Sequence, residues 1–447
     1  MRIQQRLLIV GVALAATVAL GGCGGGASAR RGADTTCDGK VKGTTHLTVW
    51  FHASASVGAE KDTMQRQVAA FNAGQRDVRV KLVTLPEGDY TNLVASAAAT
   101  GNLPDVLDFD GPNLYNYAWS GKLKPIDSCL TQRQRADLLP SIRQQGTYAR
   151  RTWGVGTFDS GLGLYVRPSI FRRLGIRMPT DPADAWTAAE FTKILARLRA
   201  AGHRRPLDLH LNYTEPDEWN TYGFTPAVWS AGGDLIDRSD YRRVDGVLNG
   251  PAAVGALSTI RRWVTAGYVD PSPKADAFQR GRTPISWVGH WLFQEYTDAV
   301  GRDLRIVPLP RFGPQPATGM GSWQWGITAG AQDGDAAWRF LSFLLQPKQV
   351  LRMTRANGAV PATLSAIRRS PRFAPGGPEH LYIRQLTDGV ARPRPQTPAY
   401  PALTAAFAKA FEDIVVHRRP VRPTLDAAAR SAQDDLAAHQ YYKPTGP

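Results

Sequence analysis

Short apolar runs that alternate with helical patterns constrain the fold of this chain more than any other feature. Between the first two runs, Met64, Val68 and Phe71 recur at the spacing of an amphipathic helix. A second helical stretch ends at Gly101, just before the third run. Strands separated by helices are typical of parallel βαβ units with helices over both sheet faces, so we predict an α/β fold. The three strand-like runs span residues 46–51, 78–83 and 104–109.

The same alternation continues over the rest of the 447 residues. A chain of this length exceeds one ordinary domain, and the absence of a repeat of fixed period excludes a solenoid. We therefore expect two or three domains. Further strands are predicted at residues 161–166, 283–288 and 304–308, and further helices at 186–201, 248–266, 336–345, 349–355, 401–417 and 424–439.

Composition excludes several classes of protein. Hydrophobic residues make up 43% and charged residues 21%, as in ordinary globular proteins, which argues against a disordered or fibrous chain. The sequence has one long apolar run, at the N-terminus, so a polytopic membrane protein is excluded. The net charge of +16 makes nucleic-acid binding worth testing, but the basic residues are scattered singly and in pairs. We therefore expect a solvated basic surface and no nucleic-acid partner.

The N-terminus has the features of an export signal. A positively charged start precedes an apolar run, residues 7–20, that is too short for a stable membrane span. The run ends in Leu20-Gly21-Gly22-Cys23, which resembles a bacterial lipobox, so we predict a lipoprotein signal peptide over residues 1–22 and a lipid on Cys23. An ordinary secretory signal with an incidental cysteine is the alternative. Residues 23–43, which begin with a Gly/Ala/Ser/Arg-rich stretch, are predicted to form a flexible tether.

The three cysteines are too few for a disulfide scaffold, and they include no Cys-x-x-Cys pair that would indicate a structural zinc site. If Cys23 carries lipid, Cys37 and Cys129 remain in an oxidising compartment. There they are expected to form a disulfide that joins the end of the tether to the first domain. Two separate thiols are the alternative. The sequence predicts no metal site and no cofactor.

A series of short motifs, in a fixed order along the chain, carries a family resemblance. After the lipobox these are Leu47-Thr48-Val49-Trp50, Ala69-Ala70-Phe71-Asn72, residues 99–106, residues 117–127, Gly163-Leu164-Tyr165-Val166, residues 229–233, Gly289-His290-Trp291 and residues 357–361. Each motif is weak alone, but their order over about residues 44–440 is specific. The sequence resembles bacterial extracellular solute-binding proteins of the carbohydrate ABC-importer family, the group that contains the maltose-binding protein.

The resemblance implies a periplasmic-binding-protein-like α/β fold, in which two discontinuous lobes are joined by crossing strands and close on a ligand by a hinge. Lobe 1 would comprise residues 44–154 and 318–358, and lobe 2 residues 155–317 and 359–447. The resemblance also implies a monomer that captures a small-molecule solute, a mono- or oligosaccharide, and delivers it to the transmembrane subunits of an ABC permease. The lipid on Cys23 would anchor the protein to the outer face of the cell membrane.

A sugar presents hydroxyls at its edge and C–H groups on its faces, so its site needs carboxylates or amides together with flat aromatic rings. Ligands of open parallel sheets bind beyond the carboxyl ends of the strands, where His52 and Asp110 follow predicted strands. Asp159 lies at the first predicted crossing, and the resemblance adds aromatic contacts. The alternatives are turn or cap roles for the aspartates and core packing for the aromatic residues. The predicted ligand-binding residues are His52, Asp110, Asp159, Trp219, Tyr222, Trp291, Trp323 and Tyr400.

Catalytic motifs are absent from the sequence: it has no Gly-x-Ser-x-Gly elbow, no His-Glu-x-x-His zinc helix and no phosphate loop. We therefore predict a binding protein and not an enzyme. Two alternatives remain open. One is an exported glycoside hydrolase that uses Asp110 and Asp159 as its carboxylate pair. The other is a binder of the same fold for a non-sugar solute such as a glycerol phosphodiester, which would require arginines or helix N-termini in the cleft.

Overall fold

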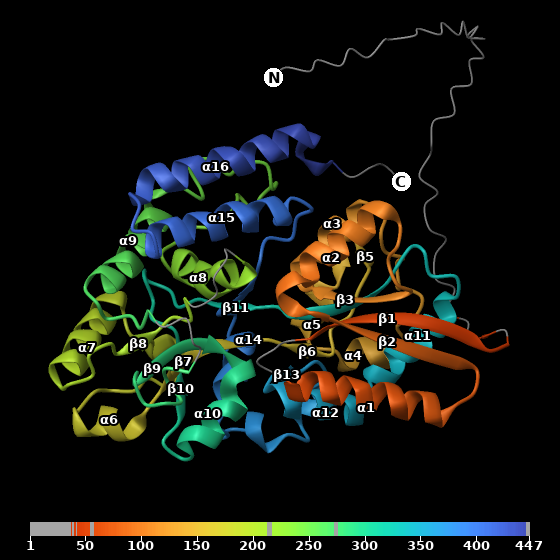
Figure 1. Cartoon of the computed structure of the whole chain (residues 1–447), viewed down its shortest axis with the longest axis horizontal. Helices are drawn as coiled ribbons and strands as arrows, with labels where there is room; N and C mark the ends of the chain where they lie inside the picture. Colours follow the sequence, from red (N-terminus) through yellow and green to blue (C-terminus); the bar gives the residue numbers. More distant parts are fainter. Residues whose placement is uncertain are drawn as a thin grey trace, which may run out of the picture. The chain divides into compact units, whose positions relative to one another are not determined.

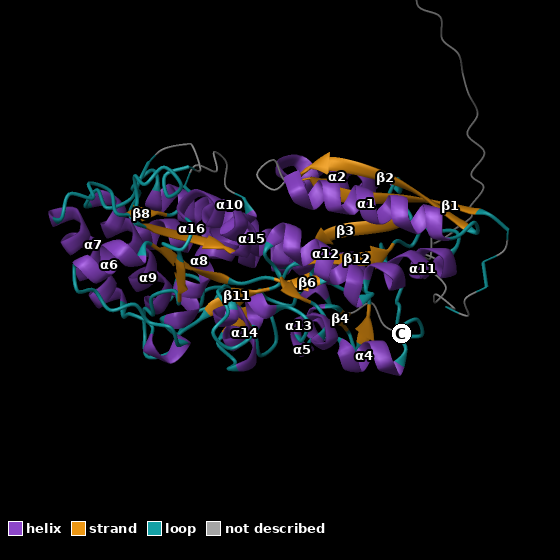
Figure 2. Cartoon of the chain, turned by 90° about the horizontal axis from the view of Figure 1, so that it is seen from below, coloured by secondary structure: helices purple, strands orange, loops and turns teal. Residues whose placement is uncertain are grey.

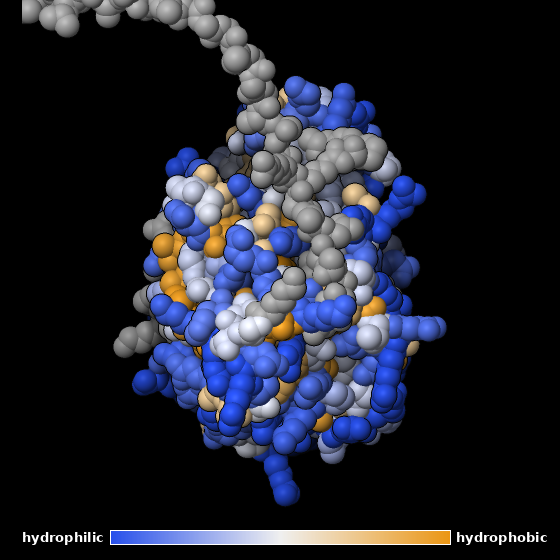
Figure 3. Space-filling view, turned by 90° about the vertical axis from the view of Figure 1, so that its right-hand side faces the viewer, coloured by the Kyte–Doolittle hydropathy of each residue, from blue (hydrophilic) through white to orange (hydrophobic). Residues whose placement is uncertain are grey.

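The computed structural model describes residues 37, 40–41, 43–53, 58–211, 217–271 and 276–443 of the chain. The predicted signal peptide, residues 1–22, and Cys23 lie outside these ranges, so the lipid on Cys23 stays a prediction. Among the residues described, no helix is both long and apolar enough to cross a membrane. Figure 3 shows a mainly hydrophilic face on which apolar residues are scattered.

The first sheet has four strands in the order β12-β3-β1-β2. β1 pairs in parallel with both β2 and β3, and α1 (Gly58–Gly74) and α2 (Glu87–Thr100) connect these strands, which confirms the predicted βαβ pattern here. The fourth strand, β12, runs antiparallel to β3. We call this sheet and its helices lobe 1. The strands are β1 (Thr45–Ala53), β2 (Val78–Pro86), β3 (Val106–Asp110) and β12 (Trp323–Ile327).

The second sheet has the order β10-β7-β9-β8, and we call it and its helices lobe 2. Its strands are β7 (Leu162–Val166), β8 (Leu207–Asp208), β9 (Ile285–Gly289) and β10 (Arg305–Val307). β8 and β9 are parallel, whereas β7 is antiparallel to β9 and to β10. Parallel pairing therefore holds for β1 with β2 and β3 and for β8 with β9, whereas β7, β10 and β12 depart from the βαβ pattern. These strands reach their neighbours through long connections instead of a single crossover helix, and such connections allow either direction.

Helices from the C-terminal part of the chain pack beside the second sheet (Figure 1). α15 (Tyr400–Val415) packs on α16 (Val421–Ala438), α8 (Glu218–Ser230) and α9 (Pro251–Thr265), and it also contacts α3 (Leu114–Trp119) of lobe 1. The remaining elements are α4 (Gln132–Asp137), α5 (Pro140–Gln145), β4 (Thr147–Tyr148), β5 (Arg151–Thr152), α6 (Pro168–Arg173), α7 (Ala188–Ala200), α10 (Phe293–Val300), α11 (Gly334–Leu344), α12 (Pro347–Asn357), α13 (Leu364–Ile367) and α14 (His380–Thr387), with short 3-10 turns between them.

Two pairs of short strands lie between the four-stranded sheets (Figure 2). β6 (Phe158–Asp159) pairs with β13 (Val360–Pro361), and β11 (Thr318–Met320) pairs with β14 (Ala391–Pro393). The chain therefore crosses between the sheets several times, as expected for discontinuous lobes. The predicted lobe boundaries fall within a few residues of these strands, and the boundaries themselves stay a prediction.

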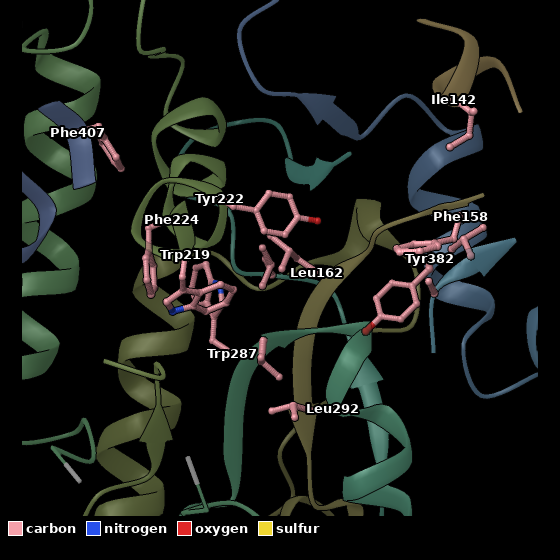
Figure 4. Packing of buried hydrophobic residues seen from close by; sticks show 14 of the residues in the cluster. Ile142, Phe158, Leu162, Trp219, Tyr222, Phe224, Trp287, Leu292, Tyr382 and Phe407 are labelled. Carbon is pink, nitrogen blue, oxygen red and sulfur yellow. The ribbon is translucent and has the colours of Figure 1, made fainter. Parts of the chain in front are cut away.

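A continuous apolar core extends from one lobe to the other through the crossing strands. Figure 4 shows Trp219 and Tyr222 of α8 on one side of Leu162, and Phe158 and Tyr382 on the other. The packing at Tyr382 requires a residue without a side chain at Gly161, because a Cβ there would lie 2.3 Å from the tyrosine ring.

A disulfide joins Cys37 to Cys129, with the two Cα atoms 4.9 Å apart. Cys129 is buried in the segment between α3 and α4, and Cys37 packs against the core from the N-terminal side of β1. The bond closes a sequence separation of 92 residues and fixes the chain before β1 to lobe 1. This is the pairing that the sequence analysis expects.

Candidate functional site

Three of the predicted binding residues gather at one edge of the lobe 1 sheet. The rings of His52 and Trp323 are stacked, with centroids 3.5 Å apart and an interplanar angle of 6°. Trp323 lies opposite Asp110 where β12 pairs with β3, and Tyr90 of α2 packs edge-on against the indole at 5.5 Å. The sequence analysis places His52 just after the first strand. In the structure β1 continues to Ala53, so His52 lies within the strand.

His52 is held by buried acids. Its Nδ1 lies 2.5 Å from Asp108 Oδ2, and its Nε2 lies 3.6 Å from Glu60 Oε2. Burial alone lowers the pKa of His52, but Asp108 and Glu60 outweigh burial and raise this pKa well above its usual value. The His52 side chain is 2% exposed, and its ring stacks against one face of Trp323. Direct contact between His52 and a solute stays a prediction.

Three further predicted residues gather on lobe 2. Trp219 and Trp291 meet edge to face with centroids 5.7 Å apart, and Trp291 lies 6.3 Å from the Tyr222 ring. The indole of Trp291 lies directly on Gly289, where a Cβ would be 2.0 Å from the ring. Trp291 is partly exposed, whereas Trp219 and Tyr222 are buried. A flat indole face is therefore presented at the end of β9, supported by two buried rings.

Arg394, which follows β14, links the two groups of residues. Its Nη1 and Nη2 donate to the two oxygens of Asp110 at 2.6 and 2.7 Å, and Nη1 also donates to Glu218 Oε1 at 2.6 Å. The guanidinium carbon lies 4.8 Å from the ring centre of Tyr222 and 5.9 Å from that of Tyr400. One side chain thus contacts the end of β3 in lobe 1 and the first turn of α8 in lobe 2.

Glu218 is the second carboxylate of this cluster. It accepts a short hydrogen bond from the Tyr400 hydroxyl and a bond of 2.7 Å from Thr404 Oγ1. Burial raises the pKa of Glu218, and Arg394 opposes that rise. Burial also lowers the pKa of Arg394, but Asp110, Tyr400 and Glu218 more than compensate, so the guanidinium stays charged. We call Asp110, Glu218, Tyr222, Arg394 and Tyr400 the Arg394 cluster.

Asp159 has a different position from the other predicted residues. It lies in the crossing strand β6, and its side chain is fully buried. One carboxylate oxygen accepts from the backbone N–H groups of Ser160 and Gly321, at 2.8 and 3.0 Å, and the other lies 3.4 Å from Gln145 Nε2. Burial raises the pKa of Asp159. These bonds tie the crossing strand to the loop before β12, and a solute contact at Asp159 stays a prediction.

Contacts between neighbours thus connect seven of the eight predicted residues, from His52 through Trp323, Asp110 and the Arg394 cluster to Trp291 and Trp219. Arg394 and Glu218 were missed. The sequence gives no signal for Arg394, which stands among prolines and arginines at 391–395. Glu218 adjoins the predicted Trp219, and a search for carboxylates beside predicted aromatic contacts would have found it. Among the described residues, no group of three or more His, Cys, Asp and Glu side chains could hold a metal ion.

Two α/β lobes joined by crossing strands, with charged and aromatic side chains where the lobes meet, define the class of two-lobed binding proteins. The model of the bacterial extracellular solute-binding protein family matches residues 66–375, and the chain belongs to this family. A lipoprotein encoded in the oleD 5' region of Streptomyces antibioticus is 22% identical over 363 residues, which are 78% of this chain and 75% of that protein.

Two solved structures show the same fold. The GacH receptor of Streptomyces glaucescens, solved unliganded and with acarbose, has a TM-score of 0.74 and 21% identity, covering 90% of this chain and 99% of that one. MalE3 of T. maritima, solved with maltose, has a TM-score of 0.75 and 19% identity, covering 88% of this chain and all of that one.

Proposed function

We propose that this protein captures a mono- or oligosaccharide outside the cell and delivers it to the permease of an ABC importer. The observation that carries the proposal is the link that Arg394 makes between Asp110 of lobe 1 and Glu218 of lobe 2. The ring of Trp323 lies opposite Asp110, and that of Trp291 connects to Arg394 through Tyr222. The family membership supports solute capture, and the similar structures with acarbose and maltose support a sugar.

The site residues suit the two surfaces of a sugar. Arg394 holds both oxygens of Asp110 in one plane, and each carboxylate oxygen keeps a lone pair for a solute hydroxyl. The partly exposed indoles of Trp291 and Trp323 supply flat faces for the C–H groups of a pyranose ring. Because these groups come from both lobes, a solute makes its full set of contacts when the lobes are closed, and its higher affinity for that state drives closure.

The proposed setting is the outer face of the cell membrane. A lipid on Cys23 would anchor the chain there, and the Cys37–Cys129 disulfide would fix the end of the tether to lobe 1. The permease would recognise the closed form of the monomer and receive the solute unchanged, without catalysis by this chain. The lipoprotein relative from Streptomyces antibioticus supports this setting.

A thermal-shift panel tests the proposed function. The mature protein is heated with maltose, maltotriose, acarbose, common monosaccharides and their amino and acid derivatives, and with glycerol phosphodiesters. A sugar at a hundred times its dissociation constant should stabilise the folded state by about 2.7 kcal/mol. Stabilisation by a phosphodiester and by no sugar would contradict the proposal, and formation of a cleaved product would indicate a hydrolase.

A further inference from the structure

Buried polar side chains connect the two indoles that the proposed function assigns to the solute. At the lobe 1 end, His52 stacks on Trp323, and its Nε2 lies 3.6 Å from Glu60 Oε2. Glu60 comes from the first turn of α1, and its other oxygen, Oε1, accepts a hydrogen bond of 2.9 Å from Asn357 Nδ2. Glu60 and Asn357 are 6% and 2% exposed, so this bond is made away from water.

The connection continues into lobe 2. Asn357 ends α12, which packs on α1, and its carbonyl accepts a bond of 2.8 Å from His290 Nδ1. The His290 ring packs edge-on against the indole of Trp291, with centroids 5.3 Å apart. Gly358 allows this close approach, because a Cβ there would lie 2.3 Å from the His290 carbonyl oxygen. We call His52, Glu60, Asn357 and His290 the polar network.

Glu60 and Asn357 form the central bond of the polar network. Asn357 Oδ1 accepts from the backbone N–H of Ala359 at 3.1 Å, which orients the amide with Nδ2 toward Glu60. Burial raises the pKa of Glu60, but His52 and Asn357 outweigh burial and lower this pKa, so the group is a carboxylate with a partner on each side. Side chains that share a buried network respond to changes in one another. The two indoles are thus held in one framework that spans the lobes.

We propose that Glu60 and Asn357 are positioning residues that hold the indoles of Trp291 and Trp323 in the relative position in which both contact the solute. This inference rests on the proposed function, because it concerns the affinity of the same site. Neither side chain needs to touch the solute, since each acts on an indole through a histidine that packs against that indole. The polar network makes the two aromatic contacts interdependent, because a site held in its binding geometry in advance loses less entropy on binding.

Calorimetric titration with the best sugar of the thermal-shift panel tests this inference through a double-mutant cycle. Glu60→Gln should weaken sugar binding about fivefold, because the NH2 end of an amide cannot accept a hydrogen bond. In the Trp291→Ala background the same change should weaken binding by less than about twofold, because the remaining indole has no second indole to be positioned against. A merely structural role of Glu60 would give equal factors in both backgrounds. Glu190→Gln, which removes the same charge from the exposed first turn of α7 and keeps its capping box, should bind like the native protein.

An exchange of the two central side chains provides a rescue. In the double variant Glu60→Gln, Asn357→Asp, the amide at position 60 can donate to the carboxylate at position 357 while its oxygen still faces His52, and the total charge is unchanged. This variant should bind the sugar within about twofold of the native protein. Asn357→Asp alone places two acids side by side in a buried position and should weaken binding at least as much as Glu60→Gln.

The possible results separate this inference from the proposed function. If the native protein binds a sugar but Glu60→Gln weakens binding equally with and without the Trp291 ring, the inference is wrong and the function stands. If the double variant does not fold, or binds as weakly as Glu60→Gln, the pairing of these two residues is wrong. If the native protein binds no sugar, the proposed function fails and the inference with it.

Circular dichroism shows whether each variant is folded. If Glu60→Gln does not fold, Glu60→Asp takes its place in the cycle with the same expected factors, because it keeps the charge but shortens the reach to Asn357. Equal factors for Glu60→Asp in the two backgrounds would likewise overturn the inference.

Discussion

At the scale of single residues, the site is built from buried charges that compensate one another. Arg394 and His52 are both nearly inaccessible, and each faces two carboxylates. Charges in such positions persist because hydrogen bonds and opposite charges offset the loss of hydration. The two side chains have different roles: His52 stacks against the Trp323 ring, whereas Arg394 orients the carboxylates that would meet the solute.

His290 should make stability depend on pH. It lies behind Trp291, where Nδ1 donates to the Asn357 carbonyl at 2.8 Å, and burial lowers its pKa to about 4. In the unfolded chain this pKa is about 6.5, so below that pH the unfolded state binds the extra proton and stability falls. The loss between pH 6.5 and pH 4 should reach about 3 kcal/mol.

Urea unfolding at pH 7 and pH 4.5 of the native chain and of His290→Gln checks this prediction. The variant should lose about 2 to 3 kcal/mol less than the native protein over this interval. His417→Gln, at an exposed histidine, provides the control and should follow the native protein. Equal losses in the native chain and His290→Gln would show that His290 titrates normally in the fold.

At the scale of helices and strands, local patterns predicted the helices and strands of the first βαβ units and several longer elements beyond them, but not the short crossing strands, β12 or the strand partners. Residues 78–83 alternate between apolar and polar side chains, which indicates the strand found there as β2. The start of α7 is marked by the capping box of Thr187 and Glu190. β12 shows why pairing could not be predicted. It joins β3 from more than 200 residues away, and its antiparallel direction depends on the path of the whole chain. The site has the same limit, since Arg394 meets Asp110 across 284 residues.

The disulfide should stabilise the fold without changing the affinity of the site for sugar. It closes 92 residues of sequence between the tether and lobe 1, and cross-links over long segments restrict the unfolded chain most. The double variant Cys37→Ser, Cys129→Ser should therefore lose about 2–4 kcal/mol of unfolding free energy while keeping its sugar affinity. Native protein unfolded in the presence of a reductant should match the double variant. A loss of unfolding free energy below about 1 kcal/mol would show that the disulfide restricts the unfolded chain only weakly.

At the scale of the whole molecule, the crossing strands account for how one chain builds a site from two lobes. Strand β6 carries Asp159, and strand β14 leads directly to Arg394. Asp159 and the Arg394 guanidinium therefore lie at the segments about which the lobes would move. The family resemblance carried by the sequence motifs implied two discontinuous lobes joined by crossing strands. Composition and periodicity alone implied only an α/β fold. The lobe boundaries at 154, 317 and 358 follow from the same resemblance.

Calorimetric titration of the native protein, Trp291→Ala and Asp110→Asn with the best sugar of the panel tests the interlobe site most directly. Both variants should bind the sugar at least ten times more weakly, a difference of about 1.4 kcal/mol. Trp291→Ala loses the aromatic face for the sugar's C–H groups, and Asp110→Asn loses the carboxylate for its hydroxyls. Asp77→Asn, which alters an exposed acid of lobe 1, should bind like the native protein. Unchanged affinity in both site variants, with their folding intact, would place the solute elsewhere and contradict the account.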